Sequence, residues 1–235
     1  TPDDIYHLSK LAIMEYLTSG ITANADMYLT PDTMIQASED CGFRTTVIGA
    51  VNDFTQSVKE VENWYEKYHK EDGLTSYELG FHAEYTTKRE ILEGISELSK
   101  KYHAPIYTHN SESASEVAQC VERTGMTPTV YMEQLGLFEY GGGLYHCVHM
   151  SEEDLDVVKR HQISVITNPA SNLKLASGIA PIEEMLKRNI DLAIGTDGPA
   201  SNNCLDMFRE MFLVTALAKY RENDASAVDA AEVLK

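Results

Sequence analysis

The sequence has neither a long apolar run nor an excess of basic residues, and each lack argues against a class of partner. No apolar stretch in the 235 residues approaches the roughly 20 residues that a helix needs to cross a bilayer. Lysine and arginine total 19 against 37 aspartates and glutamates, which gives a formal net charge of −18 at pH 7. Because nucleic acids and anionic membranes bind basic surfaces, we expect neither of them as a partner.

Cysteine is also scarce, and no stretch is of low complexity or rich in glycine, proline and serine. None of the four cysteines forms a CxxC pair. A chain of this length needs no disulfide staples, and its first residues show no signal-peptide pattern. We therefore expect reduced thiols, a cytoplasmic protein, and one domain that covers residues 1–235.

What the sequence does contain is a regular alternation of strand and helix patterns. Helix starts carry clear signals: Thr1 precedes Pro2 as an N-cap, and Thr87–Glu90 and Ser113–Glu116 read as capping boxes. Between the helices, short apolar or β-branched runs predict seven strands, the last of them with an apolar run typical of burial on both faces. They cover residues 21–28, 45–51, 77–83, 105–108, 143–148, 163–167 and 192–195.

This alternation predicts an α/β fold with a parallel sheet. A (β/α)8 TIM barrel with seven of its eight strands present fits the count better than an open sheet. A doubly wound sheet is the alternative, but no glycine-rich phosphate loop follows the first strand. A seven-stranded barrel would leave two unpaired edges, which invite association or disorder, so a homo-oligomer is one of two expected outcomes.

Polar side chains follow the ends of the predicted strands, and in a barrel these ends share one mouth. Imidazoles and carboxylates at such positions suit a divalent metal with acid–base support. Each residue alone also has a structural explanation. His82 could pack under the next turn, Glu112 could be an acidic residue in the first turn of a helix, and Asp197 could be a turn residue before Gly-Pro. His69 and His103 lie on polar helices and are expected to be solvated. The strand-end residues are His82, His109, Glu112, His146, His149, Asn168, Asp197, Asn202 and Asn203.

Taken together, five segments resemble the amidohydrolase superfamily over nearly the whole chain. More narrowly, they are similar to its branch of aminohydrolases and chlorohydrolases, which includes S-adenosylhomocysteine and methylthioadenosine deaminases. The ordered set is specific, although no single segment would be. The segments are Pro105-Ile-Tyr-Thr-His109-Asn-Ser-Glu112, His146-Cys-Val-His149-Met-Ser, Asn168-Pro-Ala-Ser-Asn-Leu-Lys-Leu175, Gly178-Ile-Ala-Pro181 and Gly195-Thr-Asp197-Gly.

The resemblance implies a role for each matching residue. His109 corresponds to the metal-ligating histidine of the fifth strand, and Asp197 to the aspartate that binds the metal and accepts a proton from water. Glu112 corresponds to the glutamate that protonates the substrate ring. His146 corresponds to the histidine that hydrogen-bonds the attacking hydroxide or the substrate. His82 sits where the family often contacts substrate.

The implied activity is metal-dependent hydrolytic deamination of a purine-nucleoside-like or related N-heterocyclic small molecule. In that chemistry zinc hydroxide attacks an amidine-like ring carbon and ammonia leaves. The implied cofactor is Zn²⁺ or another divalent metal such as Fe²⁺ or Mn²⁺.

The sequence departs from the family in two places. The family's other two ligands form a His-x-His pair after the first strand, and no His-x-His occurs here. We therefore expect a fragment that begins after that strand and lacks the small β-domain built from both termini. Gly49 stands near where nucleoside-deaminating relatives place an arginine. A truncated or degenerate barrel without activity, and a chlorohydrolase or guanine-type aminohydrolase, remain as alternatives.

Overall fold

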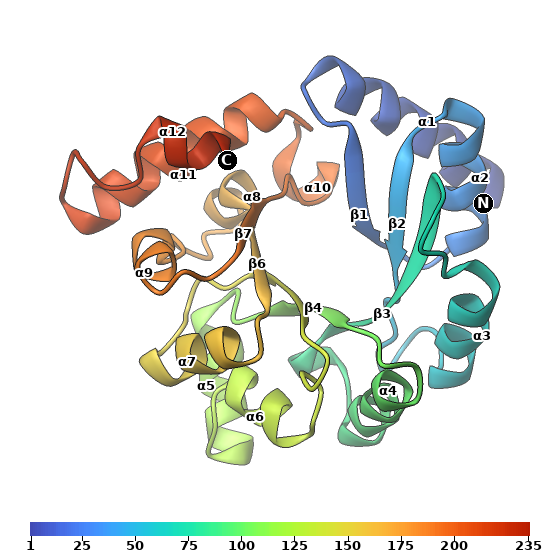
Figure 1. The fold of residues 1–235 in the computed structure, drawn as a ribbon, viewed down its shortest axis with the longest axis horizontal. Coiled ribbons are helices and arrows are strands. Elements are labelled where there is room, and N and C mark those ends of the chain that lie inside the picture. Colours follow the sequence, from blue (N-terminus) through green and yellow to red (C-terminus); the bar gives the residue numbers. More distant parts are fainter.

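The computed structural model describes residues 1–235 and contains one sheet of seven parallel strands, paired in sequence order from β1 to β7 (Figure 1). Because the order never reverses, the sheet is not doubly wound. It curls as a TIM barrel does, with β1 and β7 as its two edges, so the predicted fold is confirmed. The strands are β1 (Ala23–Met27), β2 (Arg44–Ile48), β3 (Thr75–Ala83), β4 (Ile106–Asn110), β5 (Gly142–His146), β6 (Ser164–Thr167) and β7 (Leu192–Ile194).

Helices alternate with the strands and surround the curled sheet on its outer side (Figure 1). None of them is both long and apolar enough to cross a membrane. In chain order they are α1 (Pro2–Thr18), α2 (Pro31–Cys41), α3 (Val58–Tyr68), the 3-10 turn η1 (Glu84–Thr86), α4 (Arg89–Tyr102), α5 (Ala114–Thr124), α6 (Pro128–Gln134), α7 (Glu152–Arg160), α8 (Pro169–Lys174), α9 (Ile182–Lys187), α10 (Pro199–Asn202), α11 (Met207–Glu222) and α12 (Ala230–Leu234).

Two of the predicted helix starts are confirmed and one is wrong. The side chains of Thr1 and Ser113 form complete capping boxes at α1 and α5. The box predicted at Thr87 does not form, because α4 begins after Lys88 and has no side-chain cap. Thr87 instead turns inward and is 5% exposed. The backbone N–H of Lys88 donates to Asp53 Oδ1 at 2.8 Å, which supplies an acceptor near the helix start.

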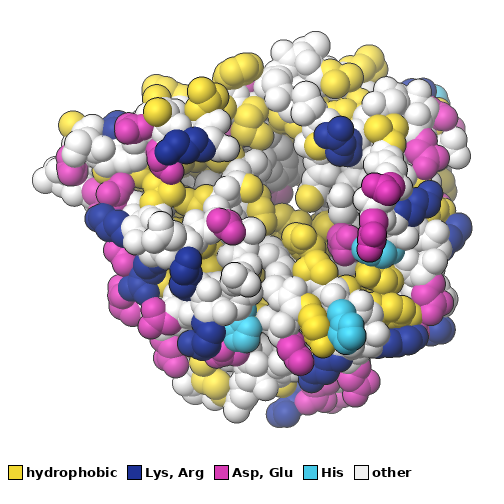
Figure 2. Space-filling view, viewed as in Figure 1, with side chains coloured by type: hydrophobic (Ala, Val, Ile, Leu, Met, Phe, Trp, Pro, Cys, Tyr) yellow, Lys and Arg dark blue, Asp and Glu magenta, His cyan; other side chains and the backbone are white.

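Alternation along each strand separates the two faces of the sheet. On β4, Ile106, Thr108 and Asn110 are buried against the helices, whereas Tyr107 and His109 on the other face are partly exposed. The outer face and the helices packed on it together form a continuous apolar core of 33 buried residues. Figure 2, the same view with side chains filled in, shows a hollow at the centre of the molecule, where the inner face lies.

The prediction that the last strand is buried on both faces is wrong. In the structure Ala193 is exposed, and its two neighbours on β7 are only partly buried. The reason is that β7 pairs with β6 alone and lies at the edge of the sheet.

Candidate active site

The carboxyl ends of strands β3, β4 and β5 bring three imidazoles together on the inner side of the sheet. The ring centroids of His82 and His109 are 5.0 Å apart, and those of His109 and His146 are 5.4 Å apart. Glu112 follows β4, and its Oε2 lies 3.7 Å from Nε2 of His146. Asp197 follows β7 and is joined to the same place by two adjacent residues, because Ser171 donates to its Oδ2 and Asn172 accepts a hydrogen bond from His146. The five residues predicted for the site therefore lie together.

The backbone at these strand ends is left-handed at residues that are not glycine. The φ angle is 48° at Ser111, 69° at His146, 48° at Cys147 and 57° at Asp197. Such conformations are uncommon and cost on the order of 1–3 kcal/mol each. Strain of this kind is typical of functional sites, where the surrounding structure holds side chains in a set direction.

His109 has the arrangement of a metal-ligating histidine. Its Nδ1 lies 2.7 Å from the backbone carbonyl oxygen of His82, to which it donates, so its Nε2 is left with a free lone pair. Ligating histidines commonly bind a second partner in this way. Burial, with the neighbouring His146 and His82, lowers the pKa of His109 to about 3. The ring is therefore neutral, as metal binding requires.

His82 is fixed by the turn that follows its strand. Its Nδ1 lies 2.8 Å from Oγ1 of Thr86, and that hydroxyl donates its own proton to the carbonyl of Ala83. His82 must therefore donate from Nδ1, which leaves Nε2 unprotonated. Burial lowers the pKa of His82 below its usual value. His82 thus packs under the turn that follows its strand, as its structural explanation predicts. It also lies beside His109.

Asp197 is held as a carboxylate. Burial alone would raise its pKa, but hydrogen bonds from the Ser171 hydroxyl and the Gly198 N–H hold the pKa below the usual value. The Ser171 hydroxyl donates to Oδ2 at 2.5 Å, and the Gly198 N–H donates to Oδ1 at 2.6 Å. An ionised carboxylate in this place can bind a cation or accept a proton.

Glu112 is placed by two sets of contacts that the sequence did not reveal. The Ser177 hydroxyl donates to Glu112 Oε1 at 3.2 Å. His149, expected at the mouth, instead donates from Nε2 to the carbonyl of Ser177 at 2.8 Å and so holds this loop. On the other side, the carboxylate of Glu116 accepts the backbone N–H groups of residues 111, 112 and 113. The capping box that predicted only a helix start also fixes the loop that carries Glu112.

Two residues of α8 complete the arrangement, and sequence reasoning assigned neither of them. Ser171 contacts Asp197, and the neighbouring Asn172 accepts a hydrogen bond from His146 Nδ1 at 2.7 Å. In the sequence both residues lie in the segment Asn168–Leu175, which resembles the family, but the resemblance implied no role for either of them. The amides after β7 act structurally: Asn202 donates to the Thr196 carbonyl and to Glu210, and Asn203 accepts from Lys174.

Of the two histidines expected at the surface, His103 is exposed and confirms the prediction. His69 does not, because it follows α3 and packs back on the chain. Its ring stacks on Tyr65 with centroids 4.3 Å apart, and its Nδ1 lies 3.2 Å from Glu78 Oε1.

The donor atoms of His109 and Asp197 suit a divalent metal, but their number is small. The chain has no group of three or more His, Cys, Asp or Glu side chains placed to hold a metal ion. Catalytic zinc sites normally have three protein ligands. Nor does the chain offer an arginine at Gly49, where a Cβ would lie 2.9 Å from both the Gly80 carbonyl oxygen and Tyr77 Oη.

Known proteins resemble this chain over its whole length. The amidohydrolase family matches residues 1–235. A 5-methylthioadenosine/S-adenosylhomocysteine deaminase of Caldanaerobacter subterraneus is 39% identical, over 100% of this chain and 56% of its own length. A 5'-deoxyadenosine deaminase of Methanopyrus kandleri is 35% identical, over 97% of this chain and 54% of its own.

The fold is shared with a crystal structure of an adenosine deaminase from Xanthomonas campestris with bound zinc. Its TM-score is 0.94 at 33% identity, over 100% of this chain and 55% of that one. The chain thus spans about half the length of the relatives that it matches. The family match over the whole sequence, together with these relatives, shows that the chain belongs to the amidohydrolase family.

Proposed function

We propose that this chain supplies the barrel of a hydrolytic deaminase that acts on a purine-nucleoside-like or related N-heterocyclic small molecule. The observation that carries the proposal is the approach of Glu112 Oε2 to within 3.7 Å of His146 Nε2, beside a neutral His109 and an ionised Asp197. The named activities of the relatives, all deaminases of adenosine-type compounds, support it. We further propose that residues 1–235 form one domain in a cytoplasmic protein, in keeping with four cysteines that are all unpaired.

In the proposed reaction, water adds to the ring carbon that bears the amino group. Asp197 accepts a proton from the water, and Glu112 protonates the adjacent ring nitrogen, so that the carbon becomes tetrahedral. The carbon–nitrogen bond to the amino group then breaks. Asp197 returns its proton to the amino group, which leaves as ammonia, and the hydroxyl on the carbon gives its proton to Glu112, so that a ring carbonyl remains. Proton transfers of this kind contribute about 10²–10⁴-fold each to a rate.

His109 and Asp197 would hold a divalent metal, for which zinc is the first choice. When bound, the metal supplies the Lewis acidity that makes water a nucleophile at neutral pH. His146, with its Nε2 facing Glu112, would hydrogen-bond the attacking oxygen, and His82 would contact the substrate beside His109.

Ammonia release from the purified full-length protein, prepared with zinc, tests the proposal. Methylthioadenosine, adenosine and guanine serve as substrates, and chloride release from a chlorotriazine tests the chlorohydrolase alternative. We expect ammonia from an adenosine-type substrate, and loss of that activity in Glu112→Gln. Glu122→Gln, an exposed position on α5, is the matched control and should keep it. Activity on the chlorotriazine alone, or full activity in Glu112→Gln, would refute the proposal.

A barrel without catalytic activity is the second candidate for residues 1–235 taken alone. It is favoured by one observation, the lack of a third metal-ligating side chain beside His109 and Asp197. The same ammonia assay, run on residues 1–235 and on the full-length protein, separates the two candidates.

A further inference from the structure

Helix α8 lies between the ends of β6 and β7 and contacts two residues of the candidate site with adjacent side chains. Ser171 binds Asp197, and Asn172 binds His146. We propose that Asn172 is a positioning residue, which fixes the His146 imidazole as the Nδ1–H tautomer with Nε2 directed at Glu112. This inference rests on the proposed function, because it assigns a cause to the geometry of the same site.

The contact between the two side chains is short and closed to solvent. His146 and Asn172 are each 1% exposed, and Nδ1 of His146 lies 2.7 Å from Oδ1 of Asn172. A carbonyl-type oxygen can only accept a hydrogen bond, so the proton must reside on Nδ1. The lone pair is then on Nε2, the nitrogen that lies 3.7 Å from Glu112 Oε2.

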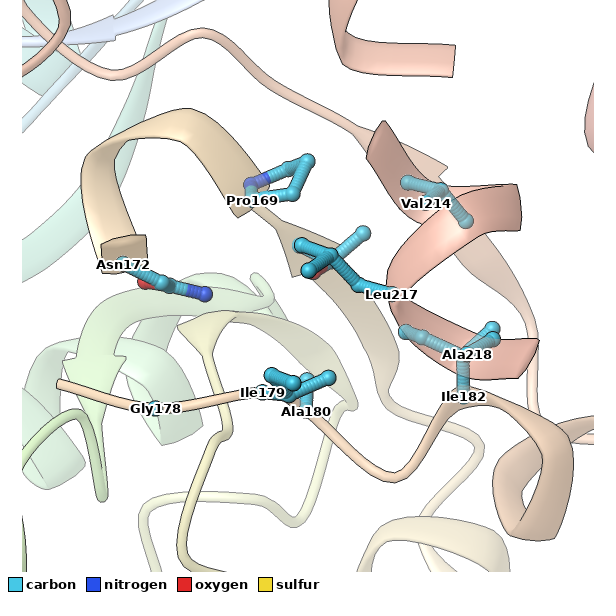
Figure 3. A pocket seen from close by; sticks show the side chains of 10 residues that line it. Pro169, Asn172, Gly178, Ile179, Ala180, Ile182, Val214, Leu217 and Ala218 are labelled. Atoms are coloured by element: carbon cyan, nitrogen blue, oxygen red, sulfur yellow. The ribbon is translucent and has the colours of Figure 1, made fainter. Parts of the chain in front are cut away.

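The orientation of the Asn172 amide agrees with this assignment. A cavity of about 10 Å³ lies between α8, the segment Gly178–Ile182 and α11, and Asn172 is part of its wall. Figure 3 shows the amide nitrogen of Asn172 turned toward this cavity and its oxygen turned away. The donor end of the amide is thus away from His146, and the acceptor end faces it.

The same residue also supports Glu112 through its main chain. The N–H of Ser177 donates to the carbonyl of Asn172 at 2.8 Å, and the Ser177 hydroxyl donates to Glu112 Oε1 at 3.2 Å. Asn172 is therefore linked to both His146 and Glu112. It binds His146 directly, and it reaches Glu112 through Ser177. A displacement of α8 would change the distance between them.

Helix α8 is itself anchored by a buried carboxylate. Glu210 of α11 is 0% exposed and accepts the N–H of Ala170 at 3.0 Å. Its other oxygen accepts from Asn202 Nδ2 at 2.8 Å, and Asn202 also donates to the carbonyl of Thr196. One carboxylate thus joins the segments that follow β6 and β7, so the position of Asn172 is set by the packed body of the fold.

The test compares two variants of the full-length protein with a matched control. Asn172→Leu has a similar size and no acceptor, whereas Asn172→Asp keeps an acceptor oxygen at the same place. Thr129→Val is the control, because it also removes a buried side-chain hydrogen bond, to Asn110, without touching His146, Glu112 or Asp197. The tautomer is read from long-range ¹H–¹⁵N correlation spectra of metal-free, ¹⁵N-histidine-labelled protein at mildly alkaline pH. The signal that disappears in His146→Gln identifies His146.

We expect the Nδ1–H pattern for His146 in the wild type, in Asn172→Asp and in Thr129→Val, and its loss in Asn172→Leu. In the ammonia assay, Asn172→Leu should lower kcat by about 10–100-fold, the usual effect of removing a partner of this kind, and leave KM little changed. Asn172→Asp should restore most of kcat.

An Nε2–H pattern for His146 in the wild type would overturn the inference, and this measurement does not depend on the folding of any variant. An unchanged pattern in Asn172→Leu would also overturn it. If the expected patterns are seen while the wild type releases no ammonia, the positioning by Asn172 stands and the proposed function fails.

Discussion

The hydroxyl of Ser171 donates to Oδ2 of Asp197 across 2.5 Å, while the N–H of Gly198 donates to Oδ1 at 2.6 Å. Both oxygens of this carboxylate are therefore bound by donors before any metal or substrate arrives. The two bonds favour the charged form and lower its pKa, although burial acts in the opposite direction. Ser171 thus binds and orients Asp197, as the adjacent Asn172 binds and orients His146.

Replacing Asp197 with asparagine should nearly abolish turnover in the full-length protein and leave the fold largely intact. An amide cannot accept a proton from water, and loss of such a group lowers kcat by about 10²–10⁴-fold. The two hydrogen bonds can be kept, because the amide oxygen still accepts from the Gly198 N–H and the Ser171 hydroxyl can itself accept from the new amide N–H. Ammonia release and circular dichroism measure the two properties. Asp191→Asn, exposed at the other end of β7, should change neither, and an active Asp197→Asn would remove this carboxylate from the mechanism.

Replacing Glu116 with alanine should both destabilise the protein and lower kcat. Its carboxylate accepts three backbone N–H groups, at 3.0, 2.9 and 3.4 Å, from the loop that carries Glu112. Leaving buried donors without a partner costs about 1–3 kcal/mol, and the released loop would no longer hold Glu112 beside His146. Urea unfolding and steady-state kinetics report on the two effects. Glu122→Ala on the exposed side of α5 is the control, and a stable Glu116→Ala with normal kcat would contradict this prediction.

The sequence predicts the gathering of the site residues because of one geometric property of parallel sheets. His109 and His146 lie at the carboxyl ends of β4 and β5, Asp197 lies just after β7, and the carboxyl ends of parallel strands meet at one mouth. Chain order alone was therefore enough to place them together. The placement required no knowledge of which helices pack on which strands.

The supporting residues could not be predicted in the same way. Asn172 and Ser177 act through contacts with residues 26 and 65 positions away, which leave no periodic signal. Helices α8 and α10 are six and four residues long, too short for apolar periodicity to mark them. Gly178 was matched only as part of a motif. Its φ is 129°, and a Cβ at this position would lie 2.9 Å from Val148 Cγ1, so a side chain is not tolerated there.

Shortening a core residue should destabilise the fold without altering the site chemistry. Leu144 on β5 is 0% exposed and faces the helices, on the opposite side of the sheet from the neighbouring Tyr145. Leu144→Ala should lower the free energy of unfolding by about 2–5 kcal/mol, because a cavity remains where the side chain was. Leu8→Ala on α1, where the leucine is 62% exposed, should change it by less than about 0.5 kcal/mol. Equal effects of the two substitutions in urea unfolding would show that β5 does not face the core as described.

Residues 1–235 alone should bind zinc weakly, whereas the full-length protein should bind it tightly. His109 and Asp197 would supply two ligands where a catalytic zinc site normally has three, and each missing ligand removes part of the bond energy that replaces water. His146 is 5.4 Å from His109 between ring centroids, but its Nδ1 is held by Asn172 and its Nε2 faces Glu112. Calorimetric titration of zinc into both forms measures the difference, and His109→Ala in the full-length protein should weaken binding strongly. Tight binding of one zinc ion by residues 1–235 would mean that another side chain, with His82 the nearest imidazole, completes the site.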